Sequence, residues 1–270
     1  MALSAATIET IAQGLDEAER SRTPIRQLTQ THPGIDIQDG YRVQRAWTAI
    51  KAARGLKVAG HKIGLTSRAM QQAVGITEPD YGVLFDDMFY EDGARIPYTR
   101  FIRPRVEVEL AFILARPLAG EQVSLYDVLE ASAWVRPAIE IIDARLQMTD
   151  PQTGATRKVA DTISDNAANA ALVVGGRPVR PAEVDLRWVS ALLYQNGVIE
   201  ESGVAAAVLN HPANGVAWLA RRLAPWGESL AAGETILSGS FTRPVFVAPG
   251  DTFHVDYGAL GSISCQFTPA

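Results

Sequence analysis

The segment RVEVELAF, residues 105–112, gives the clearest indication of how this chain folds. In a β-strand, side chains two positions apart share a face, so Glu107 and Glu109 point to one side and the apolar residues between them to the other. Two neighbouring carboxylates repel each other, and in an apolar strand they are costly to desolvate unless a cation neutralises them. The pattern therefore predicts a strand whose acidic face is matched by a cation.

A third carboxylate lies in a similar setting. Glu140 is part of AIEII, residues 138–142, which is a second short strand candidate. Three carboxylates without a nearby His or Cys are typical of a hard-cation site that holds Mg²⁺ or Mn²⁺ through oxygen ligands. A plainer alternative fits the sequence equally well, in which the acidic face is solvated or pairs with Arg103, Arg105 and Arg136.

The remaining periodicity indicates helices first and strands later. Helices are expected within residues 8–15, 43–53, 124–133 and 211–223. Strands are expected around residues 57–66, 106–114, 138–142, 186–194, 198–199, 245–247, 252–257 and 263–267, with hairpins at Asn196-Gly197 and at Pro249-Gly250. This order lacks the regular alternation of a doubly wound sheet, so an α+β fold is predicted. We place a division near residue 75, between a small α-rich region (1–75) and a β-rich domain (76–270).

The composition excludes several classes of protein. With 270 residues, 47% of them hydrophobic and 20% charged, the chain can bury a sizeable core and is not expected to be disordered. The net charge of -5 is mild, and no run of like charge suggests a nucleic-acid partner. No window approaches the roughly 18 apolar residues of a membrane span, and the N-terminus lacks a signal-peptide pattern. Because Cys265 is the only cysteine, no intrachain disulfide can form, and a cytoplasmic protein is expected.

Two further charged residues lie in segments with a constrained backbone. Lys62 is embedded in GHKIG, residues 60–64, which predicts a partly desolvated ammonium group set against an anion. Asp80 lies in the turn EPDYG, residues 78–82, and is a candidate proton carrier. An exposed lysine at a strand edge and an ordinary proline turn explain the same patterns, so neither motif is specific by itself.

Seven separated blocks, in order, resemble the hydratase branch of the fumarylacetoacetate hydrolase superfamily. The blocks are GHKIGLTSRAM (60–70), EPDYGVLFDDM (78–88), RPRVEVELAFILARPLAG (103–120), RPAIEIIDARL (136–146), DTISDNAANA (161–170), VLNHPANGVAWLA (208–220) and GSFTRPVFVAPGDTFHVDYGALGSIS (239–264). The resemblance implies an α+β fold built on a mixed β-sandwich or roll, with a smaller helical N-terminal part and a catalytic β-rich domain.

The resemblance also implies roles for the residues singled out above. Glu107, Glu109 and Glu140 would hold Mg²⁺ or Mn²⁺, and Lys62 and Asp80 would be the acid–base pair. One position departs from the pattern of relatives that act on a shorter substrate. They carry a serine where this chain has the alanines that follow Asp165-Asn166, so that serine contact cannot be carried over.

The implied activity is metal-dependent hydration of a 2-oxo-alkenoate. The likeness favours 2-oxo-hept-4-ene-1,7-dioate, converted to 4-hydroxy-2-oxoheptanedioate in homoprotocatechuate and related aromatic catabolism. Hydration of 2-oxopent-4-enoate and decarboxylation of 4-oxalocrotonate are the alternatives within the superfamily. Outside enzymes, a non-catalytic partner that binds an organic acid is the alternative, against which the intact set of charged residues argues. The second carboxylate of the diacid needs a cation, for which Arg103 and Arg105 are candidates, and Thr242 is a further candidate contact.

A homo-oligomer larger than a dimer is also expected, because relatives in this branch form closed and stacked rings. The apolar segment Val245–Val247 is a weak independent sign, since a free strand edge is seldom so apolar. The alternative is that another strand of the same chain covers it. Light scattering at micromolar concentration should give a mass well above the 29.1 kDa of one chain. A mass near that of a single chain would contradict the expectation.

Overall fold

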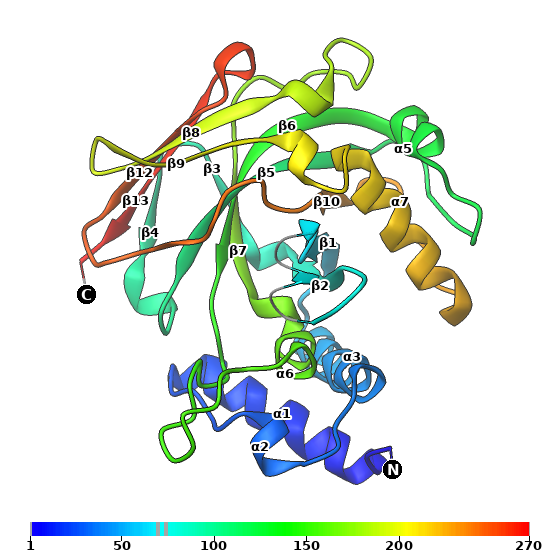
Figure 1. The fold of residues 1–270 in the computed structure, drawn as a ribbon, viewed down its shortest axis with the longest axis vertical. Helices are drawn as coiled ribbons and strands as arrows, with labels where there is room; N and C mark the ends of the chain where they lie inside the picture. Colours follow the sequence, from blue (N-terminus) through cyan, green and yellow to red (C-terminus); the bar gives the residue numbers. More distant parts are fainter. Residues whose placement is uncertain (1, 69–70, 73–74, 270) are drawn as a thin grey trace.

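The computed structural model describes residues 2–68, 71–72 and 75–269, and it has two mixed sheets above a group of helices (Figure 1). Residues 69–70, which end the block GHKIGLTSRAM, lie outside the described residues. The α+β class and the two-sheet core expected from the sequence are confirmed, and both sheets are open rather than closed into a barrel. No helix within the described ranges has the length and apolar character that crossing a bilayer requires.

The larger sheet has the strand order β2-β1-β10-β5-β6-β7-β3, with β11 paired to β5. Its strands are β1 (Val58–Gly64), β2 (Asp80–Phe85), β3 (Phe89–Glu91), β5 (Arg105–Leu114), β6 (Ser132–Ile142), β7 (Asn169–Val174), β10 (Thr235–Leu237) and β11 (Val245–Phe246). At its centre β5 and β6 are antiparallel, and their register sets Glu107 opposite Glu140. This register brings acids from distant parts of the sequence onto neighbouring strands.

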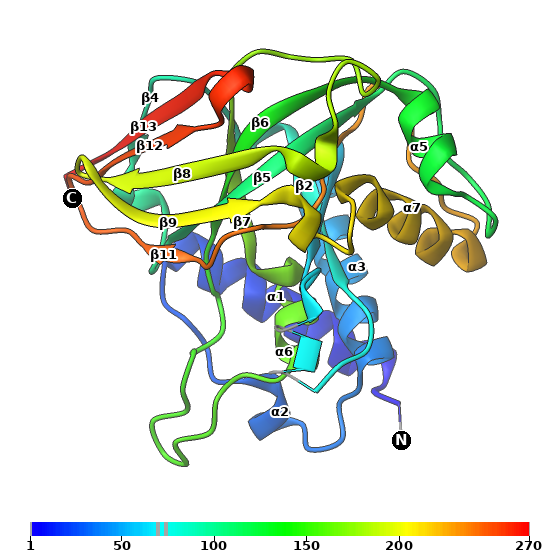
Figure 2. The same cartoon turned by 45° about the horizontal axis from the view of Figure 1, so that its top comes forward.

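The smaller sheet has the order β4-β13-β12-β8-β9. Its strands are β4 (Ala94–Pro97), β8 (Ser190–Gln195), β9 (Val198–Val204), β12 (Thr252–Asp256) and β13 (Ser262–Thr268). Figure 2 shows β8, β9, β12 and β13 lying over β5 and β6. Buried side chains of both sheets, such as Val108 and Val255, belong to one apolar core, so burial of the two inner faces holds the sheets together.

The two hairpins expected from the sequence have different outcomes. Asn196-Gly197 joins β8 to β9 with positive φ angles of 53° and 84°, as a tight hairpin turn requires, and this prediction is confirmed. The prediction of a hairpin at Pro249-Gly250 is wrong. β11 pairs with β5 of the larger sheet, whereas β12 pairs with β8 and β13 of the smaller one. The apolar segment that begins at Val245 therefore has a partner strand in the same chain.

The helices lie mainly below and beside the sheets (Figure 1). They are α1 (Ala5–Ser21), α2 (Leu28–Thr31), α3 (Ile37–Ala53), α5 (Leu125–Ala131), α6 (Val159–Ser164) and α7 (Pro212–Leu223). Ser4 and Asp36 cap α1 and α3 by accepting backbone N–H bonds, and the two helices enclose a separate apolar cluster that contains Leu15 and Trp47. The division near residue 75 stays a prediction; β1, which precedes it, is a strand of the larger sheet.

A buried ion pair fixes the segment between α6 and β7. The Nε atom of Arg145 donates to Asp165 Oδ1 at 2.6 Å, and both side chains are about 1% exposed or less. The next residue, Asn166, accepts a hydrogen bond from Val83 N–H at 2.7 Å and donates one to Val83 O at 2.9 Å. This chain of contacts anchors β2, the strand that begins with Asp80.

Replacement of Asp165 by alanine should lower the free energy of unfolding by about 3–5 kcal/mol, because Arg145 would remain buried without its counter-charge. Urea denaturation followed by circular dichroism measures this difference. Glu130→Ala is the matched control, since its pair with Arg116 is exposed on both sides and should contribute little. Equal stabilities of the two variants would show that the buried pair does not anchor this segment.

Candidate active site

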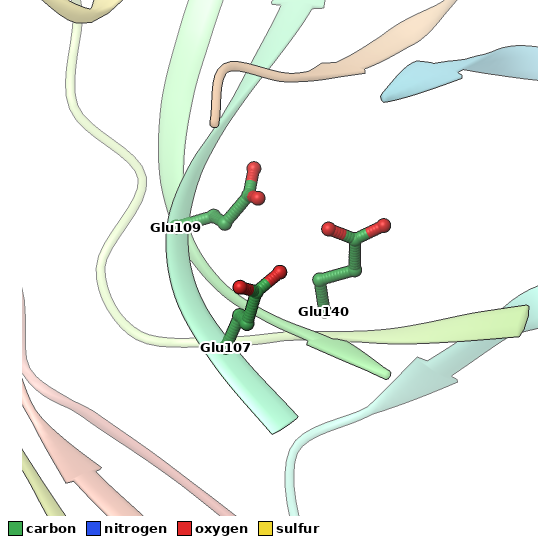
Figure 3. Close-up of side chains that lie close together, drawn as sticks. All are labelled: Glu107, Glu109 and Glu140. Carbon is green, nitrogen blue, oxygen red and sulfur yellow. The ribbon is translucent and has the colours of Figure 1, made fainter. Parts of the chain in front are cut away.

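Three glutamates converge on one side of the β5–β6 pair (Figure 3). Glu107 and Glu109 extend from β5, and Glu140 faces them from β6. One carboxylate oxygen of each lies within 4.8 Å of those of the other two. The alternation of β5 places two of these acids on one face, and the pairing of β5 with β6 adds the third.

Hydrogen bonding leaves these carboxylates largely unsatisfied. Glu109 and Glu140 are fully buried, whereas Glu107 is half-buried. Glu109 Oε2 accepts a hydrogen bond from Gly239 N–H at 2.8 Å, but within the described part of the chain Glu109 Oε1 and both oxygens of Glu140 have no hydrogen-bond donor. Because buried carboxylates are costly without compensation, the site requires positive charge.

The electrostatics of the cluster lead to the same conclusion. Burial, with the charge of Glu140 added, raises the pKa of Glu107 to about 7. Burial and the charges of both neighbours raise the pKa of Glu109 well above its usual value. Glu107 and Glu109 therefore ionise less readily than exposed glutamates unless a cation lies beside them. Among the described residues, no arginine forms an ion pair with these three acids, and Nη2 of Arg136 instead lies 3.6 Å from Glu91 Oε2. The alternative in which arginines pair with the acidic face is therefore not observed.

The donor set fits a divalent metal ion. It consists only of carboxylate oxygens, which are the ligands that Mg²⁺ and Mn²⁺ prefer, and it contains orphaned buried oxygens that such an ion would satisfy. Three protein ligands leave further coordination positions for water or for a substrate.

Lys62 on β1 and Asp80 on the adjacent strand β2 lie close to the acids, although β10 separates β1 from β5 in the sheet. Lys62 Nζ is 3.4 Å from Glu140 Oε1, and both oxygens of Asp80 lack a hydrogen-bond donor among the described residues. A Cβ atom at Gly64 would lie 2.3 Å from Asp80 Oδ1 and 3.1 Å from Lys62 Nζ, so glycine is required where the two groups approach. The sequence expectation of a desolvated lysine set against an anion is met.

The ionisation of this pair is strongly perturbed. Burial lowers the pKa of Lys62, but the carboxylates of Glu140 and Asp80 outweigh that effect and leave the pKa raised. Burial raises the pKa of Asp80, and the charge of Lys62 opposes the rise only in part. Lys62 is thus a stable cation, and Asp80 takes up a proton more readily than an exposed aspartate does. Perturbed titratable groups beside a cavity are typical of catalytic sites.

A cavity of about 410 Å³ opens beside the glutamates. Glu107 and Glu109 line it together with Thr66, Ser67, Glu201 and residues 240–244. Thr242 lies on its wall, where its Oγ1 accepts a hydrogen bond from Val108 N–H at 3.2 Å. Such a volume suits a small organic acid.

The two arginines that the sequence suggests for the second carboxylate do not line this cavity. Arg103 and Arg105 line a different hollow, where their guanidinium carbons lie 4.5 and 5.6 Å from the centre of the Phe246 ring. Sequence reasoning did not single out Arg243 or Glu201. Arg243 lies inside one of the quoted blocks, but a charged residue in a loop gives no signal of its own.

Comparison with known proteins agrees with this geometry. Residues 52–268 match the family described as fumarylacetoacetate (FAA) hydrolase C-terminal. The chain belongs to the fumarylacetoacetate hydrolase family. It is 62% identical to the 2-oxo-hept-4-ene-1,7-dioate hydratase of Escherichia coli over 95% of this chain and 96% of that protein. It is 39% identical to a 2-keto-4-pentenoate hydratase of Paraburkholderia xenovorans (strain LB400) over 96% and 94% of the two chains.

A solved structure of the same family matches nearly the whole fold. The 4-oxalocrotonate decarboxylase from Pseudomonas putida G7, complexed with magnesium and adipate, superposes with a TM-score of 0.93 at 36% identity, covering 98% of both chains. The resemblance to this family that the sequence blocks suggested is thereby confirmed, as is the hydratase branch.

Glu140→Gln should weaken Mn²⁺ binding by about 100-fold or more, because the amide removes both a ligand charge and one of the three converging carboxylates. Isothermal titration with Mn²⁺ measures the affinity directly. The exposed Glu130→Gln variant removes one negative charge elsewhere and should bind Mn²⁺ as the unmodified protein does. Unchanged affinity in Glu140→Gln would exclude this residue as a ligand.

Proposed function

We propose that this protein is a divalent-metal-dependent hydratase of the cytoplasm that adds water to 2-oxo-hept-4-ene-1,7-dioate in aromatic catabolism. The observation that carries the proposal is the convergence of Glu107, Glu109 and Glu140, the last two with unsatisfied buried oxygens, next to a cavity that Glu107 and Glu109 line. Lys62 lies 3.4 Å from Glu140, and Gly64 lies against both Lys62 and Asp80. The 62% identity to the E. coli hydratase over almost the full length of both chains supports the choice of reaction and substrate. The product is 4-hydroxy-2-oxoheptanedioate.

Glu107, Glu109 and Glu140 would hold the ion, which is Mg²⁺ or Mn²⁺. When bound, such an ion acts as a Lewis acid and stabilises negative charge on the oxygens of a 2-oxo acid. Glu109 is held in place for this role by the N–H of Gly239, and Glu140 is held by the pairing of β6 with β5 on one side and β7 on the other. Positioned ligands of this kind add no reorganisation at the moment of reaction.

Lys62 and Asp80 would move the protons. The dienol form of the substrate gives up its hydroxyl proton and gains one at C5, which produces the conjugated enone. The oxygen of water then bonds to C4, one proton of that water leaves, and C3 gains a proton. Asp80 is suited to accept and return protons because its pKa is raised, and Lys62 supplies a fixed positive charge and N–H donors at the same point.

Two groups of side chains remain candidates for substrate contacts. Thr242 lies on the cavity wall, and its hydroxyl accepts a hydrogen bond from the backbone of β5 next to Glu107. This position supports its hydroxyl as a candidate contact for a bound acid. Arg103 and Arg105 are the arginines that the sequence suggests for a second carboxylate, and their separate hollow adjoins β5.

Decarboxylation of 4-oxalocrotonate is the second candidate, favoured by the TM-score of 0.93 to the solved decarboxylase. Losing CO₂ and adding water both need charge stabilisation at the same 2-oxo acid group, so the arrangement of acids serves either reaction. The sequence identities favour the hydratase, because the match to the E. coli hydratase is 62% and that to a decarboxylase from Pseudomonas putida is 35%.

Lys62→Met and Asp80→Asn should each lower kcat about 100-fold or more. Asp80→Asn removes the group that accepts and returns protons, Lys62→Met removes the positive charge and N–H donors beside it, and both keep the side-chain shape. Loss of dienol absorbance gives the rate, and Mn²⁺ titration checks that the metal site is retained. Arg116→Gln, a surface change with an exposed side chain, is the control and should keep full turnover. Near-normal turnover in either variant would remove that residue from the mechanism.

The products distinguish the two candidate reactions. Incubated with Mg²⁺ and the seven-carbon dienol diacid, the protein should yield a product heavier by one water, and chelation of the metal should stop the reaction. The same experiment with 4-oxalocrotonate reports any loss of CO₂. Mass spectrometry of the products decides between them, and decarboxylation without hydration would contradict the proposed function.

A further inference from the structure

The cavity beside the glutamates has one cationic side chain. Of the described residues that line it, only Arg243 is positively charged, and Glu107 and Glu109 are on the same wall. A metal ion between the glutamates accounts for one anionic end of a substrate. A positive charge elsewhere on the wall is available for a second anionic group.

Backbone pairing places Arg243 beside the glutamates of β5. The N–H of Phe241 donates to Val108 O at 3.2 Å, and Val245 is opposite Val106 in the β11–β5 pair. The segment between these two contacts therefore runs alongside the part of β5 that carries Glu107. Arg243 is in the middle of that segment, about one strand spacing (~4.8 Å) from the backbone of β5.

Glu201 is the ion-pair partner of Arg243. Nη2 of Arg243 pairs with Glu201 Oε1, and Glu201 also lines the cavity. The side chain of Arg243 is 82% exposed, so the pair is weak and open to exchange. A guanidinium group has five N–H donors, so it can keep one carboxylate and bind a second in bidentate fashion.

We infer that Arg243 binds the second carboxylate of the substrate and thereby makes this cavity select 2-oxo diacids over 2-oxo monoacids. The inference rests on the proposed function. An extended seven-carbon diacid spans roughly 7–8 Å between its carboxyl carbons, as carbon–carbon bonds of ~1.5 Å require. With its 2-oxo acid end at the three glutamates, a molecule of that length reaches across a strand spacing to the side chain of Arg243. A five-carbon monoacid has no group that needs this arginine.

The position of Arg243 distinguishes it from the arginines suggested by the sequence. Arg103 and Arg105 line a hollow with Met148 and Phe246, and neither lines the cavity that contains Glu109. Both guanidinium groups lie over the ring of Phe246. A substrate anchored at the glutamates meets Arg243 within its own cavity.

Steady-state kinetics with two substrates tests the inference. Arg243→Gln should lower kcat/KM for 2-oxo-hept-4-ene-1,7-dioate by about 10- to 100-fold, mainly through a higher KM, because a charge-assisted bond made equally in ground and transition states is lost. For 2-oxopent-4-enoate, which lacks the second carboxylate, kcat/KM should stay within about 3-fold. Arg243→Lys keeps the charge but not the bidentate geometry and should fall between the two.

Three further arginine variants serve as controls for the kinetic comparison. Arg116→Gln removes an exposed arginine far from the cavity and should match the unmodified protein on both substrates. Arg103→Gln and Arg105→Gln should change both substrates alike. The inference is overturned if Arg243→Gln affects both substrates equally or neither, or if an Arg103 or Arg105 variant alone loses the diacid. Failure of the unmodified protein to hydrate the diacid would instead contradict the proposed function, and the inference with it.

Discussion

The site depends on one electrostatic constraint: Glu107, Glu109 and Glu140 converge on adjacent apolar strands, and carboxylates grouped in this way need positive charge beside them. Burial and mutual repulsion raise the pKa values of Glu107 and Glu109, and Glu140 has no hydrogen-bond donor among the described residues. The protein keeps these acids together through backbone structure. The register of β5 and β6 sets Glu107 opposite Glu140, and the hydroxyl of Tyr257 lies within hydrogen-bond distance of both strands, 2.6 Å from Ala138 O and 3.2 Å from Glu109 O. A divalent ion held by these acids, as proposed above, would offset the cost of burying them together.

Contacts of a buried ion pair also fix the strand that carries Asp80. Arg145 and Asp165 form a buried pair, Asn166 follows that pair in the chain, and its amide makes two hydrogen bonds to the backbone of Val83. A Cβ atom at Gly82 would lie 2.4 Å from Asn166 O, so the close approach of β2 to this segment requires glycine. An interaction far from the substrate thus fixes the strand that begins with the proposed proton carrier. This chain of contacts therefore links the stability of the segment to the position of Asp80.

Whether the sequence predicts a structural feature depends on how far apart along the chain the interacting residues are. Local signals worked: alternation put Glu107 and Glu109 on one face, and Asn196-Gly197 marked a hairpin. Non-local pairing was not readable from the pattern alone. The two-residue strand β11 joined β5 instead of forming a hairpin with β12. The pattern suggested Glu140 as a third acid of the site but left solvation or arginine pairing equally open until the family resemblance was added. Arg243 was missed because its neighbours in space, Glu201 and β5, come from other parts of the chain.

The central claim is that Glu107, Glu109 and Glu140 together bind one divalent ion. Anomalous scattering from crystals grown with Mn²⁺ tests it most directly, because the signal locates the metal independently of activity. The account predicts one Mn²⁺ per chain, in contact with a carboxylate oxygen of each of the three glutamates. Mn²⁺ bound elsewhere, with these three acids unliganded or paired with arginines, would contradict it.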